Sequence, residues 1–383
     1  MSTAAISETV TIGRAEQFST RIAFFIAGFG GAVWAGLVPF AKTRAGLEAG
    51  GLGLLLLAFG IGSIIAMPLA GALAGKYGCR RVLIVSSLLV CIALPALATV
   101  SSAPLLAAAL FILGAGVGSV DCVINIQAVI VERAARRALM SGFHGLFSVG
   151  GIAGAAGCAG ILSLGGSPVT VSLIAIAVTA GLLVWAAPHF IAFGGDTSGP
   201  AFALPHGVVL FIGILCFIVF LTEGSILDWS AVFLTFTRGA DPAHAGFGYA
   251  AFATTMTIGR LSGDAIVRRV SRTTIILVGG LLAASGLLVA TLVPSVTAAM
   301  IGFALVGAGC SNIVPVLYSA IGKQTLMPES VAVPAVTTLG YAGILLGPAA
   351  IGFVAHVASL PTAFLIMSVF LIGVAISGRF LKV

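Results

Sequence analysis

The chain has 383 residues, of which 60% are hydrophobic and only 8% are charged, and its mean hydropathy is +1.21. Soluble globular proteins do not have this composition, so a soluble enzyme or a soluble binding domain is excluded. The net charge of +7 would suit a nucleic-acid-binding protein, but the cations gather on one side of a predicted membrane, which favours a topology signal instead.

Twelve apolar segments follow one another along the chain, separated by short polar or Gly/Pro-containing breaks. They cover residues 20–42, 50–74, 81–100, 104–131, 138–163, 168–190, 207–236, 245–267, 273–293, 296–321, 330–356 and 361–380. Each can cross about 30 Å of hydrocarbon as an α-helix, because a helix satisfies its own backbone hydrogen bonds. The sequence therefore predicts an all-α membrane protein with twelve transmembrane helices.

The segments outside these spans divide the chain into four parts. Residues 1–19 are polar and precede an apolar run that is followed by eleven more, which predicts an uncleaved cytoplasmic tail and not a signal peptide. Residues 20–190 form one six-helix bundle, residues 191–206 a cytoplasmic linker, and residues 207–383 a second six-helix bundle. The linker overlaps the longest weakly apolar interruption of the chain, FGGDTSGPAFALPHG.

The Lys and Arg residues are distributed unequally between the two sides of the predicted membrane. With twelve spans and both termini on one side, that side carries Arg14, Arg21, Lys76, Arg80, Arg81, Arg133, Arg136, Arg137, Arg268, Arg269, Arg272, Lys323, Arg379 and Lys382. The other side carries only Lys42, Arg44 and Arg238. Because cytoplasmic loops carry the excess of cations, both termini are expected in the cytoplasm.

The two halves match each other at a shift of 193 residues. Gly114 and Gly116 align with Gly307 and Gly309, and the basic turn 76–81 aligns with the turn 269–274. One shift that holds from about residue 50 to about residue 350 predicts two parallel six-helix repeats related by a pseudo-two-fold axis. In this architecture a substrate site lies near the membrane midplane, between two halves that rock against each other.

The loop between the second and third spans carries a family signature. The segment GALAGKYGCRR fits the pattern G-x-x-x-D-R/K-x-G-R/K-R/K at Gly71, Lys76, Gly78, Arg80 and Arg81. With this motif and its twelve spans, the whole chain resembles the major facilitator superfamily of secondary transporters, which implies alternating access between two bundles. Gly75 replaces the acid of the pattern, and this puts in question the charge lock that the acid implies.

A partial copy of the signature, GRLSGDAIVRRVSR, occurs at the eighth span, and there Arg268 occupies the position of the acid. Asp264 follows Arg260 by one helical turn, so this pair could supply an alternative lock. The other interpretation is that these cations are topology signals only. The predicted gating residues are Gly71, Lys76, Gly78, Arg80, Arg81, His144, Asp228, Arg260, Asp264, Arg268 and Arg269.

Two further stretches narrow the resemblance. VDCVINIQAVIVE in the fourth span and MSGFHGLFSVGGIAGAAG in the fifth are similar to the branch of the superfamily that contains the bacterial fucose permease. This resemblance implies a location in a bacterial inner membrane and proton-coupled uptake of a sugar or of another small polar compound, with an acidic residue of the fourth span in the transport pathway.

Asp121 is the acid in that stretch. A charge in the middle of a span costs roughly 2.5–3.5 kcal/mol, so it is expected to face a wet cavity or a partner. Asn125 lies one turn further on the same face, and a protonatable acceptor beside an amide suits a proton-coupled site for a hydroxylated substrate. The alternative is that Asp121 only forms a hydrogen bond to a neighbouring helix.

The seventh span contains a second acid, Glu223, which lies well inside the bilayer and is the other predicted proton-coupling residue. Asp228 lies near the periplasmic end of the same span. Trp229 and Tyr249 could line the cavity, but Trp and Tyr also collect at membrane interfaces, and the interface is the favoured position for these two. The predicted substrate-binding residues are Trp34, Asn125, Gln127, Asn312, Tyr318 and Tyr341.

These features predict a secondary active transporter that takes up a sugar or another small polar metabolite together with protons. The alternative is a proton-driven exporter of drugs or metabolites, which would use the same acids. No catalytic constellation, phosphate loop or metal motif is present in the sequence, so we expect no enzymatic activity, cofactor or metal. The expected partners are a small-molecule substrate, protons and the lipid bilayer, with no nucleic acid, and the chain is expected to be a monomer.

Overall fold

All regular structure in the described part of the chain is helical. The computed structural model describes residues 12–47, 49–194, 203–241 and 244–381. The first half of the chain, here called the N-half, contains α1 (Arg14–Arg44), α2 (Ala49–Tyr77), α3 (Cys79–Thr99), α4 (Ala103–Ala135), α5 (Met140–Ser163), α6 (Pro168–Ala186) and the short η1 (Ala187–His189). The second half, the C-half, contains α7 (Gly207–Val232), a π-helical turn η2 (Phe233–Thr237), α8 (Phe247–Val267), α9 (Arg272–Leu292), α10 (Val296–Cys310), α11 (Ile313–Ile321), α12 (Glu329–Val357), α13 (Leu360–Ser377) and η4 (Gly378–Phe380).

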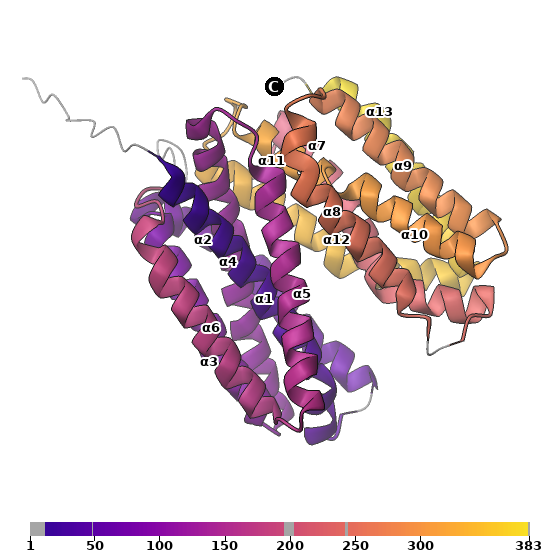
Figure 1. Ribbon diagram of the computed structural model, residues 1–383, viewed down its shortest axis with the longest axis horizontal. Helices are drawn as coiled ribbons and strands as arrows, with labels where there is room; N and C mark the ends of the chain where they lie inside the picture. Colours follow the sequence, from indigo (N-terminus) through magenta and orange to yellow (C-terminus); the bar gives the residue numbers. More distant parts are fainter. Residues whose placement is uncertain (1–11, 48, 195–202, 242–243, 382–383) are drawn as a thin grey trace, which may run out of the picture.

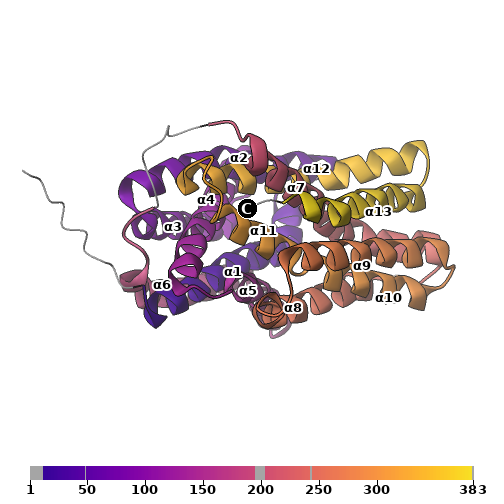
Figure 2. The same cartoon turned by 90° about the horizontal axis from the view of Figure 1, so that it is seen from above.

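The predicted all-helical membrane fold is confirmed. Within the described residues, eleven helical segments are long and apolar enough to cross a membrane, with α10 and α11 counted as one segment. Helix α8, which carries Arg260 and Asp264, is not among these eleven, but it packs between α10 and α5 and completes the twelve spans. The spans form two bundles, which Figure 2 shows side by side.

The tenth span is interrupted, which the hydropathy of the sequence did not indicate. Helix α10 ends at Cys310 and α11 begins at Ile313, so Ser311 and Asn312 separate them. Pro315 explains the break, because a proline has no N–H to donate to the carbonyl group four residues earlier, which here belongs to Ser311. The interruption places the Asn312 side chain at a helix junction.

The first helix begins earlier than the apolar run that predicted it. The Gly13 N–H donates to Glu16 Oε2 at 2.7 Å, and this capping contact starts α1 at Arg14. The end of the predicted tail is therefore helical. Residues 1–11 of that tail, residues 195–202 of the predicted linker, and Lys382 lie outside the described residues.

The two halves use the same set of helix pairs. In the N-half α1 packs on α5, α2 on α4, and α3 on both α4 and α6. In the C-half α7 packs on α12, α8 on α10, and α9 on both α10 and α13. Each C-half pair is the N-half pair moved by six spans, which is the arrangement that a sequence repeat predicts.

Glycines at equivalent positions allow close helix approaches in both halves. A Cβ atom at Gly114 would overlap the Phe59 carbonyl group, and a Cβ atom at Gly307 would overlap the Phe252 carbonyl group. Both members of the second contact follow those of the first by the same shift of 193 residues. The backbones of α2 and α4, and of α8 and α10, therefore touch in corresponding ways, as small residues permit in membranes.

We expect Gly114→Ala and Gly307→Ala each to destabilise the fold by about 1–3 kcal/mol, because the added methyl group must displace backbone atoms. The measurement is the thermal unfolding midpoint in detergent. Gly157→Ala on α5 is the matched control, because no atom lies within 4 Å of the position that its methyl group would take. The two contacts would not be equivalent if Gly114→Ala lowered the unfolding midpoint and Gly307→Ala left it unchanged.

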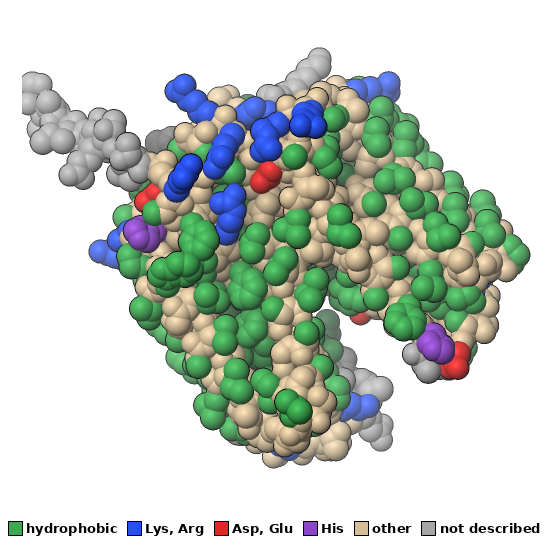
Figure 3. All heavy atoms as spheres, viewed as in Figure 1, with side chains coloured by type: hydrophobic (Ala, Val, Ile, Leu, Met, Phe, Trp, Pro, Cys, Tyr) green, Lys and Arg blue, Asp and Glu red, His purple; other side chains and the backbone are tan. Residues whose placement is uncertain are grey.

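The bundles meet at one end of the molecule and diverge toward the other (Figure 1). The contacts between the halves join α5 to α8, α2 to α12, α4 to α12, and α11 to both α4 and α5. Lys and Arg side chains gather at the end where the bundles meet (Figure 3), around the turns 136–139 and 268–271 and the end of α11. We call this the basic end and the opposite end the open end.

Candidate functional site

A cavity of about 610 Å³ lies between the two halves. Figure 3 shows the molecule hollowed between the bundles away from the basic end. Its N-half wall comes from α1 and α5 and is built largely of small residues, including Ala32, Gly36 and Gly151. Its C-half wall comes from α7 and α8, with Ile344 from α12, and the charged residues that line the cavity, Glu223 and Arg260, lie on α7 and α8.

Arg260 connects three helices at this cavity. Its side chain is only about 6% exposed, and its Nη2 donates to both oxygens of Glu223 on α7, at 3.1 and 3.3 Å. Its Nη1 donates to Ser148 Oγ on α5, at 3.1 Å. The guanidinium group therefore ties α8 to its own half through an ion pair and to the other half through a hydroxyl group. The partner of Arg260 is thus Glu223, and not Asp264 as the spacing on α8 had suggested.

Asp121 lies on α4 and is partly exposed. Its carboxylate interacts with the Tyr341 hydroxyl group of α12, across the interface between the halves, and Arg260 lies within electrostatic range. Asn125 lies one turn further, and its Nδ2 donates to the main-chain oxygen of Asp121 at 2.8 Å. The buried Oδ1 of Asn125 has no hydrogen-bond partner among the described residues, and neither Asp121 nor Asn125 is among the residues that line the cavity.

His144 and Tyr318 lie beside this group of residues. The His144 ring is 5.8 Å from the Tyr318 ring and 5.1 Å from the Phe24 ring, measured between centroids. The His144 side chain is buried, in contrast to a surface position, and its Nε2 has no hydrogen-bond partner within the described chain. The Tyr318 hydroxyl group shares a hydrogen bond of 2.7 Å with Thr337.

Three other predicted substrate-binding residues are engaged in packing or helix contacts. Gln127 is fully buried, and its amide donates to Thr20 Oγ1 at 2.9 Å and accepts from the Ile191 N–H at 3.1 Å. Trp34 belongs to an apolar cluster within the N-half and does not line the cavity. Asn312 donates to the Gly259 carbonyl oxygen at 2.9 Å, which holds the junction of α10 and α11 against α8.

The polar cavity residues Ser148 and Thr257 were not identified from the sequence. Ser148 lies in the stretch that carries the resemblance in the fifth span, one turn after His144 and on the same helix face, and this spacing was the available signal. Tyr249 lines the cavity from α8, although it was expected at the membrane interface. Asp228 is exposed, and the neighbouring Trp229 donates from its indole N–H to the Pro348 carbonyl oxygen at 3.2 Å.

At the basic end, carboxylates of both halves meet the first turn of α5. Glu132 Oε2 accepts from the N–H groups of Leu139 and Met140, at 2.8 and 2.7 Å. Asp264 Oδ1, from α8 of the other half, accepts from the Gly142 N–H at 3.0 Å. These N–H groups have no partner within the helix, and a carboxylate is favoured there by the helix dipole. Asp264 therefore joins the halves through the end of a helix.

The equivalent contact on the other side of the molecule is different in kind. Gly71 of α2 is the residue that a shift of 193 relates to Asp264, and it lies directly against Pro334 and the Ser330 carbonyl group in the first turns of α12. An ion pair between Arg133 of α4 and Glu329 of α12 adds a charged contact nearby. The basic end is thus held together by a close backbone approach between α2 and α12 and by the Asp264 carboxylate between α8 and α5.

Among the described residues, the remaining predicted gating residues form no side-chain hydrogen bond or ion pair to the other half. Arg80 donates to the carbonyl oxygens of Phe190, at 3.0 Å, and of Pro188, so it holds the end of the sixth span within the N-half. Gly78 has φ of 86° and lies against the Ala192 carbonyl group, a position that only glycine fits without strain. The exposed cations of the two basic turns are Lys76, Arg81, Arg268 and Arg269.

We expect Asp264→Asn to loosen the basic end. Asparagine keeps an acceptor for the Gly142 N–H but removes the negative charge from the start of α5, an effect of about 0.3–1 kcal/mol. The open population at this end should therefore rise roughly two- to fivefold. A cysteine introduced between the halves at this end reports the change as faster thiol labelling. Unchanged labelling would leave Asp264 as a static contact.

The family model of the Major Facilitator Superfamily matches residues 21–330. An uncharacterized MFS-type transporter of Yersinia pestis is 52% identical over 380 residues, which is 99% of each chain. An uncharacterized transporter of Sinorhizobium fredii is 32% identical, over 91% of this chain and 93% of its own.

The fold is similar to solved transporter structures at low sequence identity. A variant of the E. coli fucose:proton symporter FucP has a TM-score of 0.80 at 18% identity, and the comparison covers 96% of this chain and 98% of the symporter. The proton:xylose symporter XylE, bound to 6-bromo-6-deoxy-D-glucose, has a TM-score of 0.75 at 16% identity, covering 97% of this chain and 96% of that one.

Proposed function

The chain belongs to the major facilitator superfamily, and we propose that it couples the uptake of a small polar metabolite, most simply a sugar, to protons. It is a carrier of small molecules and not an enzyme. The moving units are the two six-helix bundles, residues 20–190 and 207–383, which rock about the cavity between them. Alternating access of this kind exposes one central site to the two sides of the membrane in turn.

The observation that carries this proposal is the placement of the charged residues between the halves. Arg260 and Glu223 line the cavity, and Arg260 reaches Ser148 of the other half. Asp121 and Tyr341 meet across the same interface. Intramembrane charges are costly and mark transport pathways by default, so a group of three beside a cavity supports a transport site.

Asp121 is the proposed proton carrier. The Arg260 guanidinium group already compensates the negative charge of Glu223 through a direct ion pair. Asp121 belongs to neither of the ion pairs that join described residues, and its nearest polar partner is the neutral Tyr341 hydroxyl group. A carboxylate without a cation in contact gains most from binding a proton, so Asp121 can change its charge during the cycle.

The available acceptors and rings support a hydroxylated substrate. Asn125 Oδ1 and His144 Nε2 are unpartnered acceptors buried behind the cavity lining, and Tyr341 adds a ring and a hydroxyl group, so these groups suit hydroxyl groups of a substrate that enters as the halves move. The names of the structural neighbours, a fucose:proton and a xylose symporter, point in the same direction. The alternative, a proton-driven exporter of apolar compounds, is favoured by the largely apolar cavity wall, which includes Phe147, Ile152 and Met256.

The charge distribution supports the orientation of the protein in a bacterial inner membrane. If the basic end faces the cytoplasm, both termini are cytoplasmic and the cavity opens to the outside. The conformation described here is then the one that accepts substrate for uptake.

Currents from proteoliposomes on a solid-supported membrane test this function. Fucose, xylose, a sugar acid and the lipophilic cation ethidium are applied in turn, without any other driving force. The uptake proposal is supported by an inward current that a sugar elicits and that disappears when a protonophore short-circuits proton movement across the membrane. A response to ethidium alone favours the exporter, and no response to any sugar overturns the proposed substrate class.

A further inference from the structure

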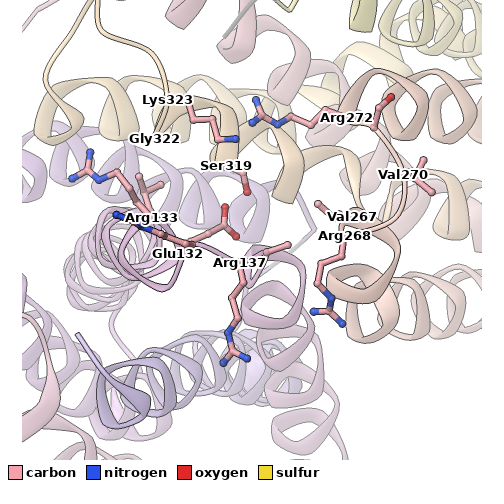
Figure 4. Close-up of a pocket in the computed structure, with 14 residues that line it drawn as sticks. Glu132, Arg133, Arg137, Val267, Arg268, Val270, Arg272, Ser319, Gly322 and Lys323 are labelled. Atoms are coloured by element: carbon pink, nitrogen blue, oxygen red, sulfur yellow. The ribbon is translucent and has the colours of Figure 1, made fainter. Parts of the chain in front are cut away.

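A second cavity, of about 640 Å³, lies at the basic end between the two bundles (Figure 4). One wall is the end of α4 and the turn that leads to α5. The other wall is the turn between α8 and α9 together with the end of α11. Its charged lining residues are six cations and one acid: Arg133, Arg136, Arg137, Arg268, Arg272, Lys323 and Glu132. The pocket is therefore strongly positive, and both halves of the protein build it.

The acid in the lining is directed to the start of α5. Glu132 Oε2 accepts from the N–H groups of Leu139 and Met140, so it caps that helix. Of the cations, Arg133 pairs with Glu329, and Arg137 donates to Gln17 Oε1 at 2.5 Å. The positive charge of this pocket is thus only partly compensated by the protein.

Two cations, one on each half, are not engaged. Within the described chain, the side chains of Arg136 and Lys323 form no hydrogen bond and no ion pair. Arg136 also ends α4 in the left-handed conformation, with φ of 50°, which residues other than glycine rarely adopt. In Figure 4 the side chains of Lys323 and Arg272, which both belong to the C-half wall, point toward one another. Like charges held in this way favour a multivalent anion between them.

We propose that this pocket binds a phosphate-bearing anion and that the bound anion holds the basic end closed. The planar donors of arginine match the oxygens of a phosphate group, and lysine adds a compact charge. A volume of about 640 Å³ accommodates a phospholipid headgroup or a soluble polyphosphate. Both sources present the same chemistry to the pocket.

The effect on conformation follows from the construction of the pocket. Opening of the basic end separates the turn 136–139 from the turn 268–271, so the complete set of cations exists only in the closed arrangement. A ligand that binds one arrangement better than the other shifts the equilibrium toward it. This consequence rests on the alternating access proposed above, in which the anion slows the step that releases substrate at the basic end.

Distances between spin labels on the two halves test the proposal. Ala15 and Ala265 are exposed on α1 and α8 near the basic end, and cysteines introduced there can be labelled selectively because all six native cysteines are buried. The full chain is measured in detergent with inorganic tripolyphosphate, and in nanodiscs of phosphatidylglycerol or of phosphatidylcholine. We expect tripolyphosphate, phosphatidylglycerol or both to raise the fraction of the short distance, and phosphatidylcholine to leave it unchanged.

The variant pair Arg136→Gln and Lys323→Gln removes one unengaged cation from each half. The anion concentration needed for the shift should rise roughly tenfold, as expected for the loss of charge-assisted contacts. The matched control is Arg14→Gln with Arg379→Gln, which removes the same charge from exposed positions at this end but outside the pocket. The control should respond as the native protein does.

Each outcome decides the question. A response to tripolyphosphate alone identifies a soluble ligand, and a response to phosphatidylglycerol alone identifies a lipid. No response, or an equal loss in the test and control variants, overturns the site. If substrates drive currents but no anion changes the distances, the proposed transport function stands and the anion site is wrong. If an anion changes the distances but no substrate drives a current, the anion site stands and the proposed substrate class is wrong.

Discussion

Asp121→Asn should abolish uptake driven by a pH gradient and leave substrate exchange intact. A gradient of one pH unit stores about 1.4 kcal/mol, so a carrier that moves one proton with each substrate can accumulate the substrate about tenfold. Asparagine mimics the protonated carboxylate at almost constant volume but cannot release a proton. The variant should therefore only equilibrate the substrate, while exchange between two loaded pools continues because it requires no deprotonation.

The measurement is accumulation of a labelled substrate in proteoliposomes, with and without the pH gradient, beside counterflow of the same substrate. Asp241→Asn serves as the control, because it neutralises an exposed carboxylate in the connection between α7 and α8, outside the cavity. Normal accumulation by Asp121→Asn would assign the proton to Glu223 and leave Asp121 as a partner of Tyr341.

Arg260→Gln is expected to cause the largest loss of stability of any single change at the site. The side chain is buried, and its removal leaves the Glu223 carboxylate without its cation in the interior of the bundle. Breaking a buried ion pair in this way costs about 3–5 kcal/mol, whereas replacing both partners is often close to neutral. The double variant Arg260→Gln with Glu223→Gln should therefore recover most of the stability that the single variant loses.

Thermal unfolding of the four proteins of this cycle measures the coupling between the two residues. Arg269→Gln is the control for loss of one positive charge, because Arg269 is exposed at the basic end. A double variant less stable than Arg260→Gln would mean that the ion pair does not explain the effect of the arginine, and that its contact with Ser148 matters more.

The sequence predicts how deep a residue lies in the membrane better than it predicts which neighbours its side chain faces. Hydropathy places Asp121 and Glu223 well inside their spans. Both lie between the halves, as expected from the free-energy cost of exposing a charged side chain to lipid. The same depth argument applied to Trp34 and Gln127 gives no information about which neighbours they meet. Trp34 packs within the N-half, and Gln127 satisfies its amide on α1 and on the segment after α6.

The sequence also did not predict the ion-pair partner of Arg260. Spacing along one helix suggested Asp264, but Glu223 on the neighbouring helix is 37 residues away and lies closer in space. The pairing of α7 with α8 depends on how the bundle packs, which a single sequence does not specify. By contrast, the sequence alone predicted the repeat at a shift of 193 residues, because the glycines at helix contacts recur at that shift. The directions of the side chains have no such pattern in the sequence.

The unlike contacts at Gly71 and Asp264 give the closing surfaces forces of different range. The contact of Gly71 with the start of α12 is one of touching atoms, and a gap of about 0.5–1 Å already forfeits a quarter to a half of such an attraction. The attraction between the Asp264 carboxylate and the N–H groups at the start of α5 is electrostatic, so it declines more gradually over the first ångströms of separation and fades over about one helical turn. We therefore expect the touching contact at Gly71 to be lost first as the bundles part, while the Asp264 carboxylate and the Arg133–Glu329 ion pair still attract across the gap on both edges.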